Sequence, residues 1–235
     1  DPYRVRVLGE FPRMSDSQLI PSDLVQAARQ RQLEPRDWYR FPMMIGVDVA
    51  RGGGAGDRSV IIRRQGPKVW TPRSWRDIDT MELAAMVVEE VKTHHPMQVY
   101  VDGTGVGAGV VHRLKQLDMP VVDVVVGSSA RDRLAYVNLR SELWGRMRDW
   151  IRGDVDLPDA NDDLAKELVQ VEYKYDAKLR LQVERKDQMM SRGLASPDFA
   201  DALALTFTDD AGATRLSPVN ISARTVVPAR ASGWS

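Results

Sequence analysis

Blocks of apolar residues along the chain predict an α/β domain. Short blocks of apolar or β-branched residues predict strands, and the almost wholly apolar block MMIGVDVA has the composition of a buried strand. The Gln-Gly-Pro sequence at 65–67 predicts a tight turn, so the strands on either side of it are expected to form a hairpin. The predicted strands span residues 43–50, 58–65, 68–75, 97–102 and 121–127, with a late strand at 178–184.

Apolar residues spaced three and four positions apart predict helices between and after these strands. Asp79 or Thr80 is the expected N-cap of the helix that follows the third strand. Ser22 is expected to cap the first helix, and Ser196 to cap the last one with Pro197 at its first position. The predicted helices span residues 23–32, 80–95, 110–117, 138–151, 162–171 and 197–207.

The order of these elements predicts how the chain is organised. Three strands, a helix, a strand, a helix and a strand, followed by helices, predict a central mixed sheet of five or more strands flanked by helices. Residues 37–210 are expected to form this domain, and residues 1–36 a lead-in segment with a short strand and a helix. Residues 211–235 are rich in small and polar residues without a period, and they predict a flexible tail.

The composition narrows the chemistry that this domain can perform. Of the 235 residues, 43% are hydrophobic, which suffices for one sizeable core. No apolar run approaches the roughly 20 residues that a membrane-spanning helix needs. The first residues show no basic region followed by an apolar stretch, so the sequence does not predict a secretory signal. The absence of cysteine excludes disulfides and thiolate metal sites, and 3 histidines are few for a zinc enzyme.

The charge balance bears on nucleic-acid binding. Lys and Arg together number 33, as do Asp and Glu, so the net charge is zero. Proteins that grip nucleic acid unaided are usually basic. The balance therefore argues against a tight, free-standing DNA binder, and it leaves open a nuclease whose grip on DNA comes from another domain.

Three aspartates stand out by their position. Asp48 lies in the first strand, Asp102 ends the fourth and Asp198 begins the last helix. An unpaired charge among apolar side chains is very costly, so an acid at the end of a buried strand usually faces a cleft, pairs with a cation or binds a metal. The first and fourth strands of such a pattern often lie side by side, which brings Asp48 and Asp102 together. Carboxylate oxygens suit Mg²⁺ or Mn²⁺, and two such ions serve phosphodiester cleavage.

Each of these acids also has a purely structural interpretation. Asp102 precedes a glycine and is a typical turn former, and Asp198 would stabilise the first turn of its helix. Asp201 lies three residues after Asp198 on nearly the same helix face, and it is a candidate ligand beside Asp198 or in its place. Asp57 either reaches back to the site or only starts the second strand. Lys186 either neutralises phosphate charge at the site or, like most lysines, is solvated.

Other motifs in the sequence bear on phosphate and nucleotide binding. Arg131 and Arg133, in a polar loop after the fifth strand, are candidate phosphate contacts. The stretch DGTGVGAG superficially resembles a dinucleotide-binding loop, but it follows the fourth strand rather than the first. The backbone amides at this helix start can instead meet a DNA phosphate. The sequence contains no P-loop motif and no persuasive Ser-His-Asp set.

Three segments of the chain resemble, in order and spacing, the acidic motifs of a known family. They are IGVDVARGGGAGDRSVII, VYVDGTGVGAGVVHRLKQL and SPDFADALALTF, and the family is the nuclease domain of large terminase subunits, the DNA-packaging motors of tailed bacteriophages. The lead-in VRVLGEFPRMSDSQLIPSDLVQAA also resembles the connection from the motor's ATPase domain to its nuclease. In addition, DFADALAL resembles the last motif of Holliday-junction resolvases, where both acids of a D-x-x-D pair matter, and this favours Asp201.

The resemblance implies a ribonuclease H-like fold and a metal-dependent endonuclease that cuts concatemeric double-stranded viral DNA during packaging into procapsids, in the host cytoplasm. It implies two Mg²⁺ or Mn²⁺ ions, held by Asp48, Asp102 and Asp198 with help from Asp201. It also implies an ATPase domain, a small terminase subunit and a portal as partners of the complete protein. Because this sequence lacks the ATPase half, the chain alone is not expected to translocate DNA. A junction-resolvase-like nuclease and a non-catalytic ribonuclease H-like docking module remain as alternatives, with a nucleotide-binding domain more remote.

Overall fold

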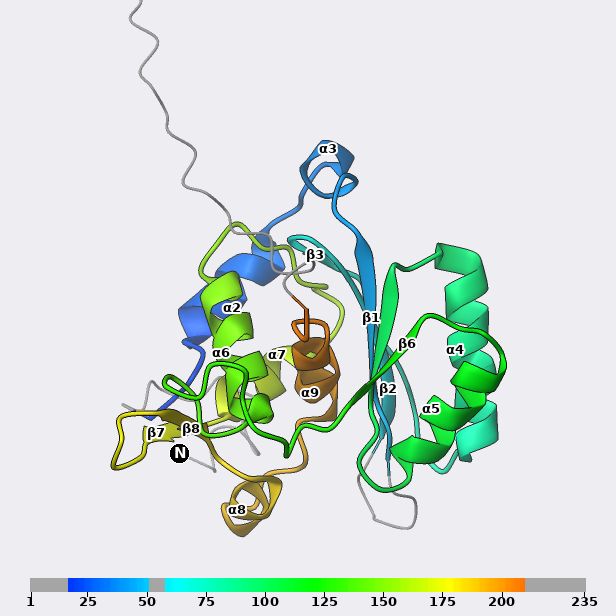
Figure 1. Cartoon of the computed structure of the whole chain (residues 1–235). Helices are drawn as coiled ribbons and strands as arrows, with labels where there is room; N and C mark the ends of the chain where they lie inside the picture. Colours follow the sequence, from blue (N-terminus) through cyan, green and yellow to red (C-terminus); the bar gives the residue numbers. More distant parts are fainter. Residues whose placement is uncertain (1–16, 51–57, 210–235) are drawn as a thin grey trace, which may run out of the picture.

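A mixed β-sheet divides the protein in two (Figure 1). A computed structural model describes residues 17–50 and 58–209, and within these ranges the sheet has six strands. They are β1 Met43–Asp48, β2 Ser59–Gln65, β3 Lys68–Val69, β4 Arg73–Trp75, β5 Gln98–Asp102 and β6 Val121–Val124. The order is β3-β2-β1-β5-β6, and β4 also pairs with β2. β1 is antiparallel to β2 and parallel to β5, and β5 is parallel to β6.

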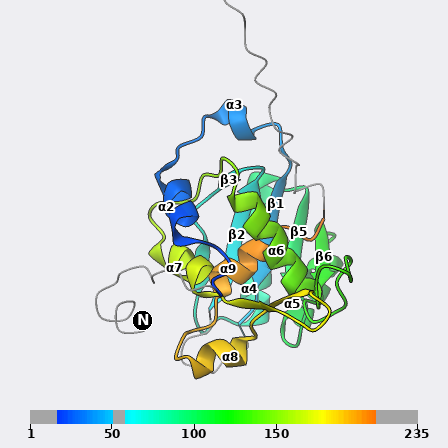
Figure 2. The ribbon, with the colours of Figure 1, turned by 90° about the vertical axis from the view of Figure 1, so that its left-hand side faces the viewer.

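Helices cover both faces of this sheet. On one face lie α4 Thr80–His94 and α5 Gly107–Gln116. On the other face α9 Asp198–Leu205 packs directly against β1 and β2, and it is backed by α6 Leu139–Ile151 and α7 Asp162–Gln170 (Figures 1 and 2). The outer elements are α2 Ser22–Gln30, α3 Pro35–Trp38, the hairpin of β7 Tyr173–Tyr175 and β8 Leu181–Val183, and α8 Lys186–Ser191.

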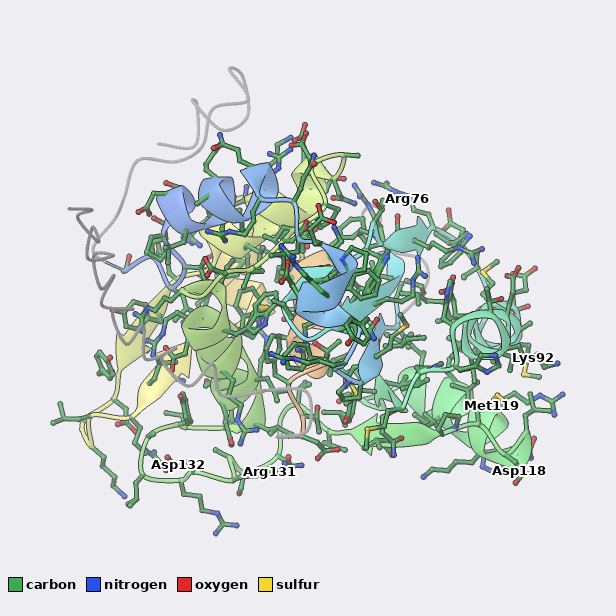
Figure 3. All side chains as sticks on the ribbon, turned by 90° about the horizontal axis from the view of Figure 1, so that it is seen from above. Arg76, Lys92, Asp118, Met119, Arg131 and Asp132 are labelled. Atoms are coloured by element: carbon green, nitrogen blue, oxygen red, sulfur yellow. The ribbon has the colours of Figure 1, made fainter. Side chains whose placement is uncertain are left out.

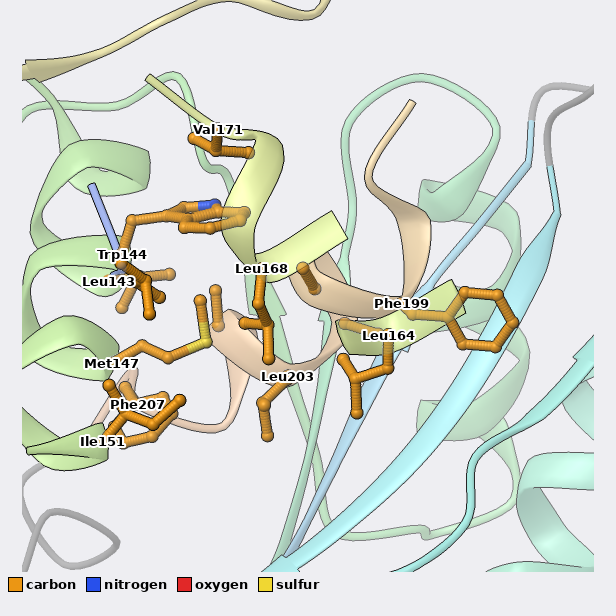
Figure 4. Close-up of a cluster of buried hydrophobic side chains, with 14 of the residues drawn as sticks. Leu143, Trp144, Met147, Ile151, Leu164, Leu168, Val171, Phe199, Leu203 and Phe207 are labelled. Carbon is orange, nitrogen blue, oxygen red and sulfur yellow. The ribbon is translucent and has the colours of Figure 1, made fainter. Parts of the chain in front are cut away.

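The larger part of the core lies between α9, α6 and α7 (Figure 4). Leu143, Trp144 and Met147 lie on the side of α6 that faces α7 and α9, so α6 buries one apolar stripe. A second, smaller cluster fills the space between the opposite face of the sheet and α4 and α5. Because both faces are covered, β1 and β5 are apolar throughout except near their ends, as the MMIGVD and QVYVD sequences show.

The structure confirms most of the predicted elements. The first and fourth predicted strands, β1 and β5, are parallel neighbours as expected. The hairpin turn lies at Gly66, whose φ of 56° is a conformation that glycine adopts without strain. Asp79 is the N-cap of α4, since its side chain accepts hydrogen bonds from the amides of Met81 and Glu82. The fold class, an α/β protein with a mixed sheet flanked by helices, is confirmed.

Several details of the prediction were wrong. The predicted strand 68–75 is two short strands, β3 and β4, which both pair with β2. Ser22 is the first residue of α2 rather than its cap, and no side chain caps that helix. At α9, Pro197 takes the N-cap position and Ser196 lies before it. The elements α3, α8 and β7 were missed, because pieces of three to six residues are too short to show a period.

The lead-in and the tail are described only in part. From residue 17 onward the lead-in packs against the main core, where Leu19, Ile20 and Val25 are fully buried. The short strand predicted at 5–12 and the tail at 211–235 lie outside the described residues, and the domain boundaries remain predictions. Among the described helices, none is long and apolar enough to cross a membrane.

Candidate active site

The four candidate acids lie at one edge of the sheet. Asp48 ends β1 and Asp102 ends β5, and parallel neighbouring strands bring their carboxyl ends to the same edge. Asp198 and Asp201 occupy the first turn of α9, which packs against β1 at this point. All four side chains line a single cavity of about 450 Å³. The structure therefore brings together residues that are 153 positions apart in the sequence, from 48 to 201.

A lysine lies at the centre of this cluster. The Nζ atom of Lys186, at the start of α8, is 3.2 Å from Asp201 Oδ2, 3.6 Å from Asp48 Oδ2 and 3.8 Å from Asp198 Oδ1. Its side chain is 42% exposed, while the three carboxylates are buried. One oxygen of each carboxylate thus faces a common point that a positive charge already occupies.

Each of the two α9 carboxylates is fixed by further hydrogen bonds. Asp198 Oδ2 accepts the backbone N–H of Arg58, at 2.9 Å, from the residue before β2. Asp201 Oδ1 accepts the indole N–H of Trp144, at 2.8 Å, and two N–H groups of Arg140. The remaining oxygens, Asp198 Oδ1 and Asp201 Oδ2, are those that face Lys186.

A partly buried glutamate holds the start of α9. Glu167 of α7 accepts the backbone N–H of Ala200, 3.0 Å from its Oε2 atom, so it caps α9 in place of the predicted Ser196. Burial raises the pKa of Glu167 well above its usual value, although the amides of Ala200 and Phe199 act in the opposite direction. The first turn of α9 is therefore fixed from α7 as well as by its packing on β1.

A close backbone approach lets α9 lie against β1. Gly46 is in the middle of β1, and a Cβ atom there would be 1.9 Å from the carbonyl oxygen of Ala202. The helix backbone thus contacts the strand with no side chain between them, and this contact sets the distance from Asp198 and Asp201 to Asp48.

The surroundings raise the pKa of two of the acids, Asp48 and Asp198, and lower the pKa of Asp201. Burial raises the pKa of Asp48 to about 8, and the carboxylates of Asp201, Asp198 and Asp102 add to the effect while Lys186 opposes it. Burial also raises the pKa of Asp198. For Asp201, burial is outweighed by Arg140, Lys186 and the Trp144 hydrogen bond, and the pKa is lowered. Close carboxylates with separated pKa values are typical of sites that bind a cation or move a proton.

The raised pKa of Asp48 predicts how the stability of the metal-free protein depends on pH. Between the unfolded pKa, near 4, and the folded pKa of about 8, the folded state keeps a proton that the unfolded state has released. The free energy of unfolding should therefore fall as pH rises from 5 to 8, by roughly 2–5 kcal/mol. Urea unfolding in EDTA would measure this, with Asp48→Asn as the reference. An equal pH dependence in the two proteins would contradict the raised pKa.

The donor set fits a divalent cation. Three carboxylate oxygens, from Asp48, Asp198 and Asp201, converge on one point, and Asp102 lines the same cavity. Oxygen donors of this kind suit Mg²⁺ or Mn²⁺. Within the described residues, however, no group of three or more His, Asp or Glu side chains is already arranged to hold a metal ion. Here the Lys186 ammonium lies at the meeting point of the oxygens.

The other predicted residues lie away from this cluster or outside the described ranges. Arg131 pairs with Asp209, at 3.1 Å, and its side chain is 51% exposed. Figure 3 shows Arg131 and Asp132 on the outer edge of the molecule, in the loop between β6 and α6. Arg133 is also exposed in that loop. Asp57 lies in the segment that the structure does not describe, so its place relative to the site remains a prediction.

Sequence reasoning missed the residues that support the acids. Arg140 and Trp144 appeared only as parts of an amphipathic helix, and Glu167 only as part of a short one. None of them has a local signature, because their partners lie 33 to 61 residues away. Gly46 did have a signal, since an isolated glycine inside an apolar strand often marks a close backbone approach.

Comparisons with known proteins identify the fold. No family model and no curated protein matches the sequence. A variant nuclease domain of the large terminase subunit gp2 of bacterial virus Sf6, with manganese and beta-thujaplicinol, has a TM-score of 0.70 and 18% identity over 81% of this chain and 98% of that chain. The large terminase nuclease of thermophilic phage G20c with bound magnesium has a TM-score of 0.61 and 15% identity over 83% and 99%.

The nuclease domain of the Thermus phage P74-26 large terminase is also similar, with a TM-score of 0.56 and 15% identity over 79% of this chain and 93% of that one. The three structures cover 79% to 83% of this chain. In fold, therefore, this chain is similar to the nuclease domains of phage large terminase subunits.

Proposed function

We propose that this chain is a divalent-metal-dependent endonuclease that cuts concatemeric double-stranded viral DNA during genome packaging. The observation that carries the proposal is the convergence of the Asp48, Asp198 and Asp201 oxygens on one point of a cavity that Asp102 also lines. The similar terminase nuclease structures with manganese and with magnesium support the same chemistry.

In this proposal Asp48, Asp102, Asp198 and Asp201 hold one or two Mg²⁺ or Mn²⁺ ions. When bound, such ions activate water for attack on phosphorus and stabilise the leaving oxygen. The carboxylates fix where the scissile phosphate lies, because α9 and β1 hold them rigidly. Lys186 offsets the carboxylate charge before DNA enters, and its exposed ammonium offers a positive charge to the phosphate.

Other groups are proposed to supply the rest of the affinity for DNA. Arg131 and Arg133 lie on the loop that leaves the carboxyl end of β6, and they are proposed to contact the DNA backbone. The chain has no net charge, so most of the affinity is expected to come from an ATPase domain of the complete motor. The other proposed partners of the complete protein are a small terminase subunit and a portal, in the host cytoplasm.

Cleavage of supercoiled plasmid tests the proposal. The purified chain should cut in Mg²⁺ or Mn²⁺ and not in EDTA, and Asp102→Asn should lower the rate by about 100-fold or more, because it removes a cation-binding oxygen. Equal cutting by both proteins would place the activity elsewhere or in a contaminant. Folded protein that neither cuts nor binds metal in calorimetry would favour a docking module. Preference for four-way junctions over linear duplex would favour a junction resolvase.

A further inference from the structure

One oxygen of Asp201 is fully committed to side chains of α6. Asp201 Oδ1 accepts the Trp144 indole N–H at 2.8 Å, the Arg140 Nη2–H at 3.1 Å and the Arg140 Nε–H at 3.3 Å. Three donors around a single carboxylate oxygen leave it little capacity for another partner. The second oxygen, Oδ2, faces Lys186 and the cavity.

The Trp144 donor is buried and has one described acceptor. Trp144 is completely inaccessible to solvent, and its ring packs among the apolar side chains of α6 and α7 (Figure 4). A buried indole N–H needs a partner, since leaving a buried donor unsatisfied costs about 1–3 kcal/mol. Because the surrounding core fixes the ring, its N–H points in a fixed direction and so fixes the carboxylate that receives it.

The Arg140 guanidinium is held as firmly as the indole. Its Nη1–H donates to the backbone carbonyl of Glu184, at 2.5 Å, just after β8. Its Cζ atom lies 5.6 Å from the centre of the Trp144 ring, one helical turn further along α6. The side chain is only 14% exposed. Arg140 therefore joins α6, the end of β8 and Asp201 in one rigid arrangement.

We propose that Arg140 and Trp144 are positioning residues that lock the Asp201 carboxylate so that only its Oδ2 atom is presented to a divalent cation. This inference rests on the proposed metal-dependent function. A free carboxylate can rotate and bind a cation through one oxygen or two, whereas a carboxylate with one saturated oxygen binds through the other alone. Hydrogen bonds of this kind to metal-binding carboxylates typically matter 10- to 100-fold for metal affinity or activity.

The same helix supplies matched controls for a purely structural effect. Trp150, also on α6, donates its indole N–H to the carbonyl of Gly66 at 3.1 Å, away from the acidic cluster. Arg148 pairs with Asp149 and makes no contact with the site. Trp150→Phe and Arg148→Lys therefore remove the same chemical groups from α6 as Trp144→Phe and Arg140→Lys, without touching Asp201.

Calorimetric titration of the DNA-free chain with Mg²⁺ alone tests the proposal, together with thermal unfolding and plasmid cleavage of each variant. Trp144→Phe and Arg140→Lys should each weaken Mg²⁺ binding by about 10- to 100-fold. Trp150→Phe and Arg148→Lys should bind Mg²⁺ like the wild type, even where they lower the melting temperature as much. Arg140→Lys keeps the positive charge, so a loss of affinity there reports geometry rather than charge.

Three results would overturn the proposal. Folded Trp144→Phe and Arg140→Lys that bind Mg²⁺ as tightly as the wild type would show that Asp201 needs no positioning. Affinity that falls in all four variants in proportion to stability would show a structural role only. A wild type that neither binds Mg²⁺ nor cleaves DNA would remove the proposed function itself, and the positioning role with it. If the wild type binds Mg²⁺ but does not cleave DNA, the comparison of Mg²⁺ affinities among the four variants still decides whether Arg140 and Trp144 position Asp201.

Discussion

Replacing Asp48 by asparagine is expected to lower metal-dependent DNA cleavage by at least about 10³-fold, the equivalent of roughly 4 kcal/mol of transition-state stabilisation. Asp48 is buried at the end of β1. Its Oδ2 atom and one oxygen each of Asp198 and Asp201 face the same point, which Lys186 Nζ occupies. An amide keeps the shape of the side chain but removes the negative charge that a cation needs. Plasmid nicking at saturating Mn²⁺ would measure the loss.

The same substitution should leave the metal-free protein as stable as before or more stable above neutral pH. The raised pKa of Asp48, about 8, means that its charged form is unfavourable in the fold, chiefly because of burial. Asparagine has no charge to bury, so the folded state no longer has to retain a proton as pH rises. Loss of activity together with gain of stability is the signature of a residue retained for function.

Asp123→Asn is a matched control for this prediction. Asp123 lies in β6 near the same edge of the sheet, but its side chain is exposed and does not line the cavity. The control should cleave DNA at the wild-type rate. If Asp48→Asn cleaved within a few fold of wild type while Asp123→Asn did not, the site would have to be moved toward β6.

The central part of the site could be predicted from the sequence, because it depends on local patterns. An apolar block that ends in an acid identifies a strand end, and two such blocks, at β1 and β5, identify the shared edge. The D-x-x-D spacing in α9 places Asp198 and Asp201 on one face of a helix whatever the rest of the chain does. These three signals require no knowledge of long-range contacts.

The supporting residues could not be predicted, because their roles depend on contacts that no local pattern encodes. Arg140 and Trp144 are ordinary members of an amphipathic helix until α9 brings Asp201 beside them. Lys186 was a candidate from the sequence, but a lysine in a six-residue helix gives no sign that three carboxylates surround it. The sequence favours a solvated lysine there, and only the position of α8, between β8 and α9, places its ammonium in the cluster.

Replacing Gly46 by alanine is expected to lower the stability of the fold by roughly 3 kcal/mol and its cleavage activity by about 100-fold. An added Cβ atom would be 1.9 Å from the Ala202 carbonyl oxygen and 3.1 Å from Thr206 Cγ2. A backbone carbonyl cannot rotate away as a flexible side chain can, so α9 has to move off β1. That movement carries Asp198 and Asp201 away from Asp48, and a displacement near 1 Å is enough for a loss of this size.

Gly109→Ala separates this effect from the general consequences of adding a methyl group. Gly109 lies in α5, where a Cβ atom would come no nearer than 3.7 Å to Thr80, and alanine favours the helix by about 1 kcal/mol. Chemical denaturation should therefore show a gain for Gly109→Ala and a loss for Gly46→Ala. Because alanine is intrinsically better than glycine in a strand, only the contact with α9 explains a loss at Gly46. A Gly46→Ala variant of wild-type stability and activity would mean that this backbone contact does not set the distance between α9 and β1.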